Sequence, residues 1–426
     1  MPLSNLADKR IALWGMGREG HTTRSFLKEY FTDKKFVIIN DKPIEDIGED
    51  IFIAETELTD NLDKFDVIIK SPGISYYHDA IQIMIDHGIE ISSATNIWFD
   101  MPRKGKVIAV TGSNGKSTTS ALLHHILNEL GLNAELGGNI GTPLLSLPSD
   151  ADYYVVELSS YQICDLTGTP DIAVLLNLHP EHIQWHRSHD QYYHDKCNLL
   201  KRGADINIIN INEPRLGLTK NKIYFNDLNN VHFEGTVIYN RDMPVGVTDR
   251  FPLLGDHNLE NLCAALTITK ELGFVLTECL KASYGYLGLP HRLQVIGPIN
   301  DHYFVNDSIS TDPEATIAGL RALHDKEITL IVGGQDREQD YEELCTQIYR
   351  QNINGVITMY ETGDRIFKEL KTERKEKAIS LEDAVKIAKS ITPKGGYILM
   401  SPAAPSYDAF KDFEVRGDLF IKLANN

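Results

Sequence analysis

The sequence predicts an α/β protein with three domains, each built on a largely parallel sheet with crossover helices. Short apolar runs alternate with helical stretches along the whole chain, a pattern typical of parallel strands joined by helices. Two glycine-rich loops, at 15–20 and 111–118, each lie between an apolar run and a helical stretch. Breaks rich in Pro, Gly and basic residues lie near 101–106 and 287–292. We therefore expect Rossmann-like domains at 1–103 and 293–426, and a central domain of the P-loop mononucleotide-binding type at 104–292.

The individual elements follow from local patterns. Apolar runs that end in Gly, Ser, Asn or Asp are typical of buried strands, and apolar spacing of three and four residues predicts helices. Residues 222–255 are richer in loops and are predicted to form hairpins. The expected strands are 10–15, 35–41, 65–73, 107–111, 153–160, 171–178, 206–210, 303–308, 328–334, 355–360 and 396–403, and the expected helices include 20–30, 80–88, 116–131 and 256–273.

Composition excludes several classes of protein. The chain of 426 residues carries 60 acidic and 42 basic residues, a net charge of −18, which disfavours a nucleic-acid partner. Its five cysteines form no CxxC pair, which favours a reducing compartment over a disulfide framework or a zinc site. No stretch approaches the ~18 apolar residues needed to span a membrane, and Gly interrupts the first apolar run. We expect a cytoplasmic protein with no membrane partner.

The first glycine-rich loop has the pattern of a dinucleotide fingerprint. Gly15, Gly17 and Gly20 follow a predicted strand, and Asp41 ends the next one. Such glycines allow a tight turn and close approach of a diphosphate to a helix N-terminus. NAD, another nucleotide diphosphate, and a purely structural turn are all compatible with this loop. The stronger phosphate loop downstream favours another diphosphate over NAD.

The second loop, TGSNGKST at 111–118, predicts ATP binding. Its backbone N–H groups can surround phosphate oxygens, Lys116 can reach the β- and γ-phosphates, and the Ser117 hydroxyl can bind Mg²⁺. Val110 occupies the first Gly position of the general G-x-x-x-x-G-K-[ST] motif, so the loop is a shortened variant. The residues expected to hold the nucleotide are Gly112, Ser113, Asn114, Gly115, Lys116, Ser117 and Thr118.

Polar residues at later strand ends complete the predicted site. Glu157 and His182 each follow an apolar run, where open α/β sheets bind their ligands, and both suit Mg²⁺ or a substrate. A zinc cluster of the neighbouring histidines is disfavoured because no thiolate lies nearby. Lys196 lies in a helical stretch, where the alternative is a solvated helix face.

Taken together, these motifs resemble the Mur ligase family, the ATP-dependent amide-forming enzymes of peptidoglycan precursor synthesis. The resemblance covers the whole chain, and the combination of motifs is far more specific than any one of them. The GMGREG opening and the C-terminal SPAAPSYDAFKDFEVRGDLF are most similar to the member that adds glutamate to UDP-N-acetylmuramoyl-L-alanine. The segments that carry the resemblance are TGSNGKST, GGNIG (137–141), ELSSYQ (157–162), Asn-x-x-x-x-His (177–182), GDHNLENLCAA (255–265), GLPHR (288–292) and VNDS (305–308).

The resemblance implies a role for each matching residue. It implies a UDP-sugar site, an ATP site with two Mg²⁺ ions, and a glutamate pocket, in a protein that acts as a monomer on small molecules. It also implies that Lys116, His182 and a carbamylated Lys196 are catalytic. The matching residues are Gly17, Arg18, Glu19, Asp41, Ser71 and Asn139 for the UDP-sugar, Ser117, Glu157, His182 and Lys196 for magnesium, Asn258, Asn261, Arg292 and Asp307 for the nucleotide, and Ser406, Tyr407 and Phe413 for glutamate.

The implied reaction passes through an acyl phosphate. Lys116 and the metal ions neutralise the γ-phosphate while the acceptor carboxylate attacks it, and the glutamate amine then displaces phosphate.

Three positions depart from the family pattern. Ile309 replaces the lysine of the usual glutamate-adding member, and Gln184 replaces an aspartate that commonly follows the histidine. Arg337 stands near the other carboxylate-binding position and is expected to hold the glutamate side chain. The C-terminal resemblance favours D-glutamate, whereas Ile309 keeps an L-glutamate-adding ligase as the alternative. An NAD-dependent oxidoreductase is the third and least favoured interpretation.

Overall fold

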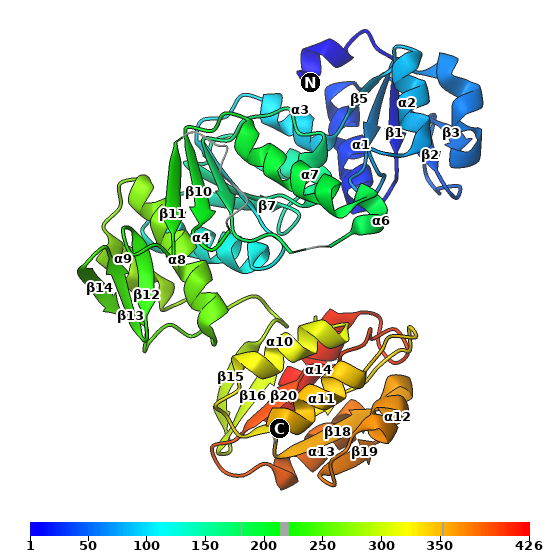
Figure 1. Cartoon of the computed structure of the whole chain (residues 1–426). Helices are drawn as coiled ribbons and strands as arrows, with labels where there is room; N and C mark the ends of the chain where they lie inside the picture. Colours follow the sequence, from blue (N-terminus) through cyan, green and yellow to red (C-terminus); the bar gives the residue numbers. More distant parts are fainter. Residues whose placement is uncertain (180, 214–220, 352) are drawn as a thin grey trace. The chain divides into compact units, whose positions relative to one another are not determined.

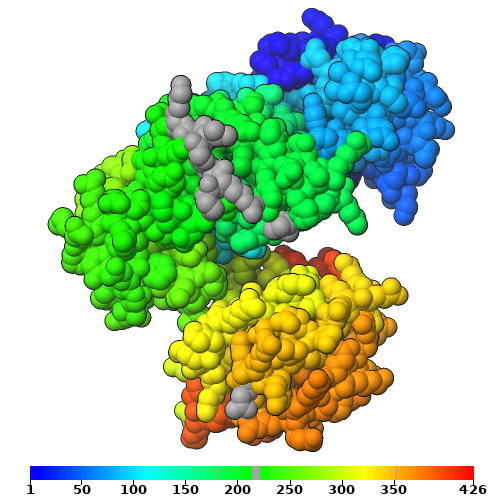
Figure 2. All heavy atoms as spheres, viewed as in Figure 1, coloured from blue at the N-terminus to red at the C-terminus, as the bar shows by residue number. Residues whose placement is uncertain are grey.

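The computed structural model of the chain describes residues 1–179, 181–213, 221–351 and 353–426 (Figures 1 and 2). The described residues form two compact units. One comprises Met1–Thr248 with Glu260–Ser283, and the other comprises Asp249–Leu259 with Tyr284–Asn426. Each unit is α/β, with mainly parallel sheets covered by helices, as the sequence predicts.

The first sheet has five parallel strands in the order β3-β2-β1-β4-β5. Figure 1 labels β1, β2, β3 and β5 of this sheet. The central strands are buried on both faces because Ala12 and Trp14 point to one side and Leu13 to the other. The order reverses at β1, and ligands of open α/β sheets bind at such a point. The strands are β1 (Ile11–Trp14), β2 (Val37–Asn40), β3 (Ile51–Ala54), β4 (Val67–Lys70) and β5 (Glu90–Ser92); the helices are η1 (Leu3–Leu6), α1 (Arg18–Tyr30), η2 (Glu55–Lys64), α2 (Asp79–Asp86) and α3 (Ala94–Asp100).

The second sheet of this unit has six parallel strands in the order β11-β10-β9-β6-β8-β7. β6 lies in its middle, so the phosphate loop that follows β6 starts from the best-buried part of the sheet. The strands are β6 (Lys106–Thr111), β7 (Ala134–Gly138), β8 (Tyr153–Glu157), β9 (Ile172–Leu175), β10 (Ile206–Asn210) and β11 (Lys222–Phe225); the helices are α4 (Lys116–Glu129), η3 (Leu144–Ser146), α5 (Ser160–Cys164), α6 (Ile183–His186) and α7 (His189–Lys201).

A small antiparallel sheet follows in the order β12-β13-β14, within the segment predicted to form hairpins. Its strands are paired through tight turns, as expected for a loop-rich stretch. The elements are β12 (Val231–Glu234), β13 (Val237–Asn240) and β14 (Met243–Val247), and they precede α8 (Asp256–Glu271) and α9 (Leu276–Ser283).

The last sheet has six strands in the order β15-β16-β20-β17-β18-β19, parallel except for the edge strand β15. Leu330 and Val332 pack on one face, and Ile331 and Ile398 pack on the other. The strands are β15 (Gln294–Ile299), β16 (His302–Asn306), β17 (Ile328–Val332), β18 (Gly355–Met359), β19 (Lys375–Ala378) and β20 (Tyr397–Met400); the helices are α10 (Pro313–Ala322), α11 (Glu342–Gln351), α12 (Tyr360–Glu369), α13 (Leu381–Ile391) and α14 (Phe413–Asn425).

Across the part of the chain that is described, no helix combines the length and the apolar character needed to cross a bilayer.

Candidate active site

The phosphate loop connects β6 to α4 and is shaped by a glycine in the left-handed region. Gly115 has φ +81°, and a Cβ there would lie 2.4 Å from Oδ1 of Asn261, so a larger residue cannot replace it without movement. The Asn114 N–H donates to Oδ1 of Asn177 (2.8 Å), whose amide donates back to the Asn114 carbonyl (3.1 Å). The loop is thus braced at the N-terminus of α4, where free N–H groups favour an anion.

Lys116 and Asn261 both contact the phosphate loop or the first turn of α4 that follows it. The Lys116 ammonium donates to the Ser113 carbonyl (2.6 Å), so it is held against the loop. Oδ1 of Asn261 accepts a hydrogen bond from the hydroxyl of Thr119 (3.1 Å), the residue that directly follows the GKST run of the loop. Asn258 belongs to the other compact unit, where its amide donates to the Leu254 carbonyl (2.7 Å).

Glu157 ends β8 as a fully buried carboxylate. Its Oε1 accepts a hydrogen bond from Nδ2 of Asn139 (2.6 Å), whereas its Oε2 is buried without a hydrogen-bond partner among the described residues. A buried carboxylate oxygen with no partner is costly, so a cation is the partner that this oxygen suits best.

Lys196 lies on α7 and points inward to the same loop. Only 2% of it is exposed, and its Nζ donates to the Gly112 carbonyl (2.6 Å), so the alternative of a solvated helix face is wrong. Burial, reinforced by the Lys116 charge, lowers the pKa of Lys196 to about 7. A large share of the amine is therefore neutral, and hence nucleophilic, near physiological pH.

His182 precedes α6 with a left-handed φ of +53° and has a half-exposed side chain. Burial of part of the ring lowers the pKa of His182, which favours the neutral imidazole that can bind a metal. Its ring centroid lies 5.0 Å from that of Tyr161.

The side chains at this site could supply some, but not all, of the ligands of a magnesium ion. Within the described ranges, no group of three or more His, Cys, Asp or Glu side chains is placed to hold a metal. Mg²⁺ is usually held by one or two carboxylates together with phosphate oxygens and water. The orphaned oxygen of Glu157 and the Ser117 hydroxyl therefore suit an ion shared with a bound nucleotide better than a cage made by the protein alone.

Residues expected to bind the UDP-sugar gather at the carboxyl ends of β1, β2 and β4. Gly17 caps α1, Asp41 follows β2, and Ser71 follows β4 with its hydroxyl donating to the Gly15 carbonyl. A Cβ on Gly20 would lie 2.1 Å from that carbonyl, so the third glycine of the fingerprint permits close helix–strand packing.

The neighbouring side chains connect this edge to the second sheet. The Arg18 guanidinium donates to the Gly141 carbonyl (2.9 Å), and Asn139 meets Glu157 as described above. Glu19 is largely buried, which raises its pKa to about 7. Arg18 and Glu157 therefore both contact the segment after β7, Arg18 through Gly141 and Glu157 through Asn139.

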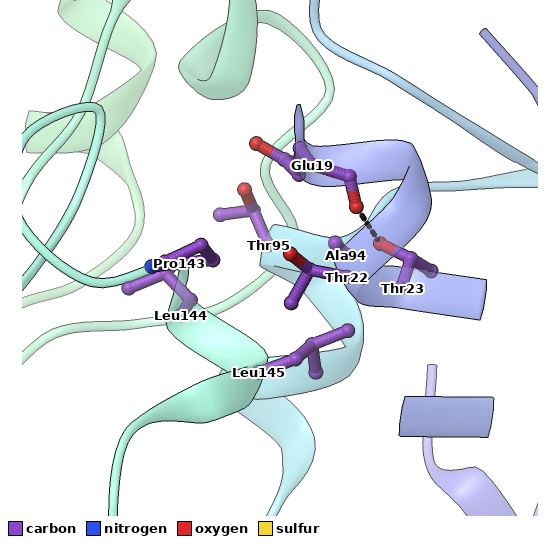
Figure 3. Close-up of a pocket in the computed structure, with 8 residues that line it drawn as sticks. All are labelled: Glu19, Thr22, Thr23, Ala94, Thr95, Pro143, Leu144 and Leu145. Carbon is purple, nitrogen blue, oxygen red and sulfur yellow. Dashed lines mark hydrogen bonds between the residues drawn. The ribbon is translucent and has the colours of Figure 1, made fainter. Parts of the chain in front are cut away.

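A pocket beside Glu19 is too small for a substrate. It lies between α1, α3 and η3 and encloses about 10 Å³, room for at most one water molecule (Figure 3). Its lining is formed by Glu19, Thr22, Thr23, Ala94, Thr95, Pro143, Leu144 and Leu145.

In the second unit, Asp307 is internal. Its carboxylate accepts hydrogen bonds from the Leu293 N–H (3.0 Å) and the hydroxyls of Ser310 (2.6 Å) and Ser401 (2.7 Å). Burial raises the pKa of Asp307 to about 6. The carboxylate thus fixes the end of β16, whereas Arg292 is exposed.

The residues expected to hold glutamate differ in exposure. Ser406 is buried, Tyr407 is 60% exposed, and Phe413 begins α14. The Arg337 guanidinium lies 5.8 Å from the Tyr407 ring centroid, which places these two predicted residues together. Ile309 is half-buried, and its N–H donates to the His291 carbonyl (3.1 Å).

Sequence reasoning missed several residues that support the site. Tyr192 holds the phosphate loop through its hydroxyl, 2.7 Å from that of Ser113, and Asn177 braces the same loop. His186 was considered only as one of a group of histidines. The position of Tyr192 one turn before Lys196 on a predicted helix was the one available signal.

The folds and the site together define a nucleotide-binding α/β enzyme whose phosphate loop lies beside a buried lysine and a buried carboxylate. Two family models match the chain, the Mur ligase middle domain over residues 110–269 and the Mur ligase, glutamate ligase domain over 291–404. The chain belongs to the Mur ligase family, and it is an ATP-dependent ligase that forms an amide bond in peptidoglycan synthesis. This assignment rules out the NAD-dependent oxidoreductase.

Full-length relatives support the assignment. The chain is 34% identical to a UDP-N-acetylmuramoyl-L-alanine--L-glutamate ligase of Xanthomonas euvesicatoria pv. vesicatoria (strain 85-10), covering all of this chain and 97% of the relative. A protein of the same name from Micromonospora sp. (strain ATCC 39149) is also 34% identical, over all of this chain and 98% of the relative.

Solved structures show the same fold at low identity. UDP-N-acetylmuramate-alanine ligase MurC from Thermotoga maritima has a TM-score of 0.58 at 18% identity, covering 97% of this chain and 98% of that one. MurF ligase from Thermotoga maritima, solved in complex with ADP, has a TM-score of 0.58 at 17% identity, covering 99% and 97%.

Proposed function

We propose that this protein joins glutamate to UDP-N-acetylmuramoyl-L-alanine through an acyl phosphate. The observation that carries the proposal is that Lys116 and Lys196 both donate to the phosphate loop, and that Glu157, with its unpartnered oxygen, ends the strand beside β6, from which this loop starts. The names of the full-length relatives supply the two substrates.

The added glutamate is proposed to be the L enantiomer. The relatives are named as L-glutamate ligases, and Ile309 removes the cation on which the D-glutamate comparison depended. D-Glutamate, which the C-terminal resemblance favours, is the alternative that the assay below decides.

The proposed chemistry balances in two steps. The acceptor carboxylate attacks the γ-phosphorus of ATP, the bond from γ-phosphorus to the bridging oxygen breaks, and ADP leaves. The neutral glutamate amine then attacks the acyl carbon, the bond from that carbon to the phosphate oxygen breaks, and one amine proton leaves with the phosphate as HPO4²⁻ as the amide forms. Mg²⁺, held by Ser117, Glu157 and His182, would supply charge neutralisation. The Lys116 ammonium and the N-terminal N–H groups of α4 stabilise the negative charge that develops on the transferred phosphoryl group.

Lys196 is proposed to be carbamylated. Addition of CO2 to its neutral amine forms an N–C bond and releases one proton, which converts a cation into an oxygen donor suited to Mg²⁺. With a pKa of about 7, about three quarters of the amine is neutral at pH 7.5, against about 0.1% at the ordinary value of 10.5.

We further propose three functional domains at 1–103, 104–292 and 293–426, acting in the cytoplasm as a monomer. None of the five cysteines, all of which lie within the described residues, forms a disulfide bond, which suits a reducing compartment.

The decisive assay measures phosphate release with ATP, Mg²⁺, UDP-N-acetylmuramoyl-L-alanine and each glutamate enantiomer separately. We expect release only when acceptor and glutamate are both present, with L-glutamate at least tenfold better in kcat/KM. Turnover with D-glutamate alone would reverse the enantiomer assignment and leave the ligase standing. Phosphate release at the same rate with and without UDP-N-acetylmuramoyl-L-alanine would show that this compound is not the acceptor.

Arg337 provides a test of the glutamate pocket. Its guanidinium can grip a carboxylate with two N–H donors, so Arg337→Ala is expected to raise the KM for glutamate at least tenfold. The KM for ATP should change less than twofold. Arg321→Ala, which removes an exposed arginine at the end of α10, is the matched control. An unchanged glutamate KM in Arg337→Ala would remove this residue from the pocket.

A further inference from the structure

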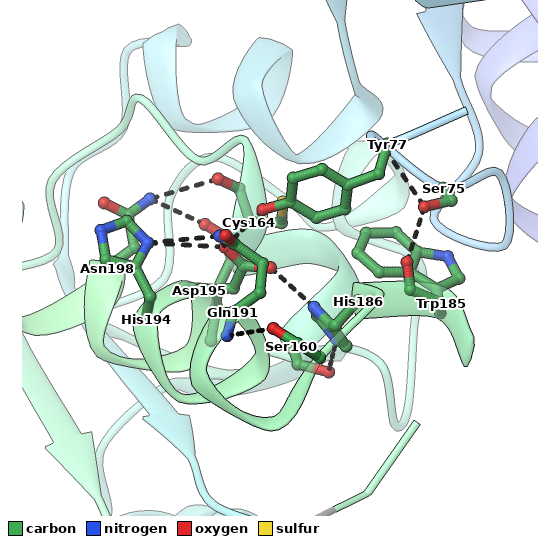
Figure 4. Close-up of polar contacts among 12 residues, drawn as sticks. Ser75, Tyr77, Ser160, Cys164, Trp185, His186, Gln191, His194, Asp195 and Asn198 are labelled. Carbon is green, nitrogen blue, oxygen red and sulfur yellow. Dashed lines mark hydrogen bonds and ion pairs between the residues drawn. The ribbon is translucent and has the colours of Figure 1, made fainter. Parts of the chain in front are cut away.

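A buried hydrogen-bonded cluster, outside the residues predicted for the site, is centred on Asp195. Its Oδ1 accepts hydrogen bonds from the Tyr77 hydroxyl and from Nε2 of Gln191, both at 2.7 Å, and its Oδ2 lies 2.6 Å from Nδ1 of His186. Nε2 of His186 lies 2.9 Å from the Ser160 hydroxyl. Figure 4 shows Tyr77, His186 and Gln191 arranged around Asp195. We call these five residues the Asp195 network.

The network touches three of the four segments that carry a candidate magnesium ligand, those of Glu157, His182 and Lys196. Ser160 on α5, His186 on α6 and Asp195 on α7 each lie within four residues of a candidate magnesium ligand in the sequence. The spacings are three residues from Glu157 to Ser160, four from His182 to His186, and one from Asp195 to Lys196.

The central groups of the network are buried in the protein interior, which limits the roles that they can have. Ser160 and Asp195 are each 2% exposed and His186 is fully buried, so these groups cannot reach a substrate themselves. A buried carboxylate that loses a partner is costly, so the contacts hold the three segments in one arrangement. Side chains one shell out commonly orient metal ligands in this way.

Tyr77 connects the network to the edge of the first sheet at which the residues expected to bind the UDP-sugar acceptor lie; we call this the acceptor-binding edge. It lies in the loop after β4, which also carries Ser71. The same loop is tied to α6 twice, since the Ser75 hydroxyl donates to the Trp185 carbonyl (2.8 Å) and the Trp185 indole N–H donates to the Gly73 carbonyl (3.2 Å). A side chain of the acceptor edge therefore reaches the carboxylate next to Lys196.

We infer that Asp195 and His186 are positioning residues that hold the segments of Glu157, His182 and Lys196 in register, and that Tyr77 ties the acceptor-binding loop to them. This inference rests on the proposed function for its substrates. It assigns no contact with substrate or metal to any of the three residues.

The first experiment tests the metal side of the inference without turnover. Calorimetry would measure the affinity for adenylyl imidodiphosphate with and without Mg²⁺. In Asp195→Asn the gain in affinity produced by Mg²⁺ should fall about tenfold, in the range typical of lost outer-shell partners. Asp190→Asn changes an exposed aspartate on the same helix and should leave that gain unchanged. Equal behaviour of the two variants would overturn the inference.

The second experiment tests the acceptor side. Tyr77→Phe removes only the hydroxyl that reaches Asp195, and it should raise the KM for UDP-N-acetylmuramoyl-L-alanine at least fivefold while the KM for ATP stays within twofold. Tyr76→Phe is the matched control, because no hydrogen bond of the Tyr76 hydroxyl is found among the described residues. If Tyr77→Phe leaves the KM for the acceptor unchanged, Tyr77 does not tie the acceptor-binding loop to the Asp195 network.

The outcomes separate this inference from the proposed function. If the wild type releases no phosphate with this acceptor, the proposed function fails, while the calorimetry still tests the network. If Asp195→Asn does not fold, Ser160→Ala replaces it, since it removes the hydroxyl partner of His186 without disturbing a charge. A uniform loss of folded protein with normal magnesium-dependent affinity in Ser160→Ala would show a purely structural role and reject the inference.

Discussion

Lys116→Ala is expected to lower kcat for phosphate release by about a hundred- to a thousandfold. The ammonium is held against the phosphate loop by the Ser113 carbonyl, within reach of the phosphates expected there. Alanine removes that charge where negative charge develops in the transition state, and single groups of this kind commonly contribute this much. The measurement is phosphate release at saturating ATP, Mg²⁺, acceptor and glutamate.

Two further variants make the Lys116 result specific. Lys106→Ala removes an exposed lysine at the start of β6 and should leave kcat within twofold of the wild type. Lys116→Arg keeps the charge but changes its shape, so it should retain more activity than Lys116→Ala. A Lys116→Ala enzyme close to wild-type kcat would show that the nucleotide does not bind at this loop.

The parts of the fold that were predictable are those with strong local signals. β1, β4 and β6 are short apolar runs ending at Gly, Ser or Thr, and the phosphate loop is marked by its own glycines. Parallel strands carry their carboxyl ends to one edge, so Glu157 and the loop could be expected close together without any contact being known.

The parts that were missed depend on contacts between distant residues. β3 was not predicted as a strand, because its run, Ile51–Ala54, is followed by Glu55 and lacks the Gly, Ser or Thr that marks the ends of β1, β4 and β6. The pairing of Tyr77 with Asp195 spans 118 residues, and no periodicity in either segment indicates it. Likewise, nothing local indicates that both oxygens of Asp307 are hydrogen-bonded within the protein, Oδ2 by the Ser310 and Ser401 hydroxyls and Oδ1 by the Leu293 N–H.

Lys196→Ala is expected to be nearly inactive, with kcat reduced at least a hundredfold. The amine is buried against the Gly112 carbonyl, so alanine removes both that bond and the proposed carbamate oxygens from the interior of the site. Short carboxylates such as formate or acetate should restore part of the activity, because they can supply an oxygen donor in the space that the side chain leaves. The control is Lys201→Ala, an exposed lysine at the end of the same helix, which should keep wild-type kcat.

The carbamate itself can be tested by the dependence on CO2. Only the neutral amine reacts, and because burial lowers the pKa of Lys196 to about 7, the neutral fraction rises steeply between pH 6 and 8. Wild-type enzyme depleted of CO2 should therefore regain activity on addition of bicarbonate, and more completely at pH 8 than at pH 6. Lys196→Ala should show no response to bicarbonate at either pH. A CO2-depleted wild type that keeps full activity would leave Lys196 as a buried amine that supports the loop through Gly112, with no carbamate.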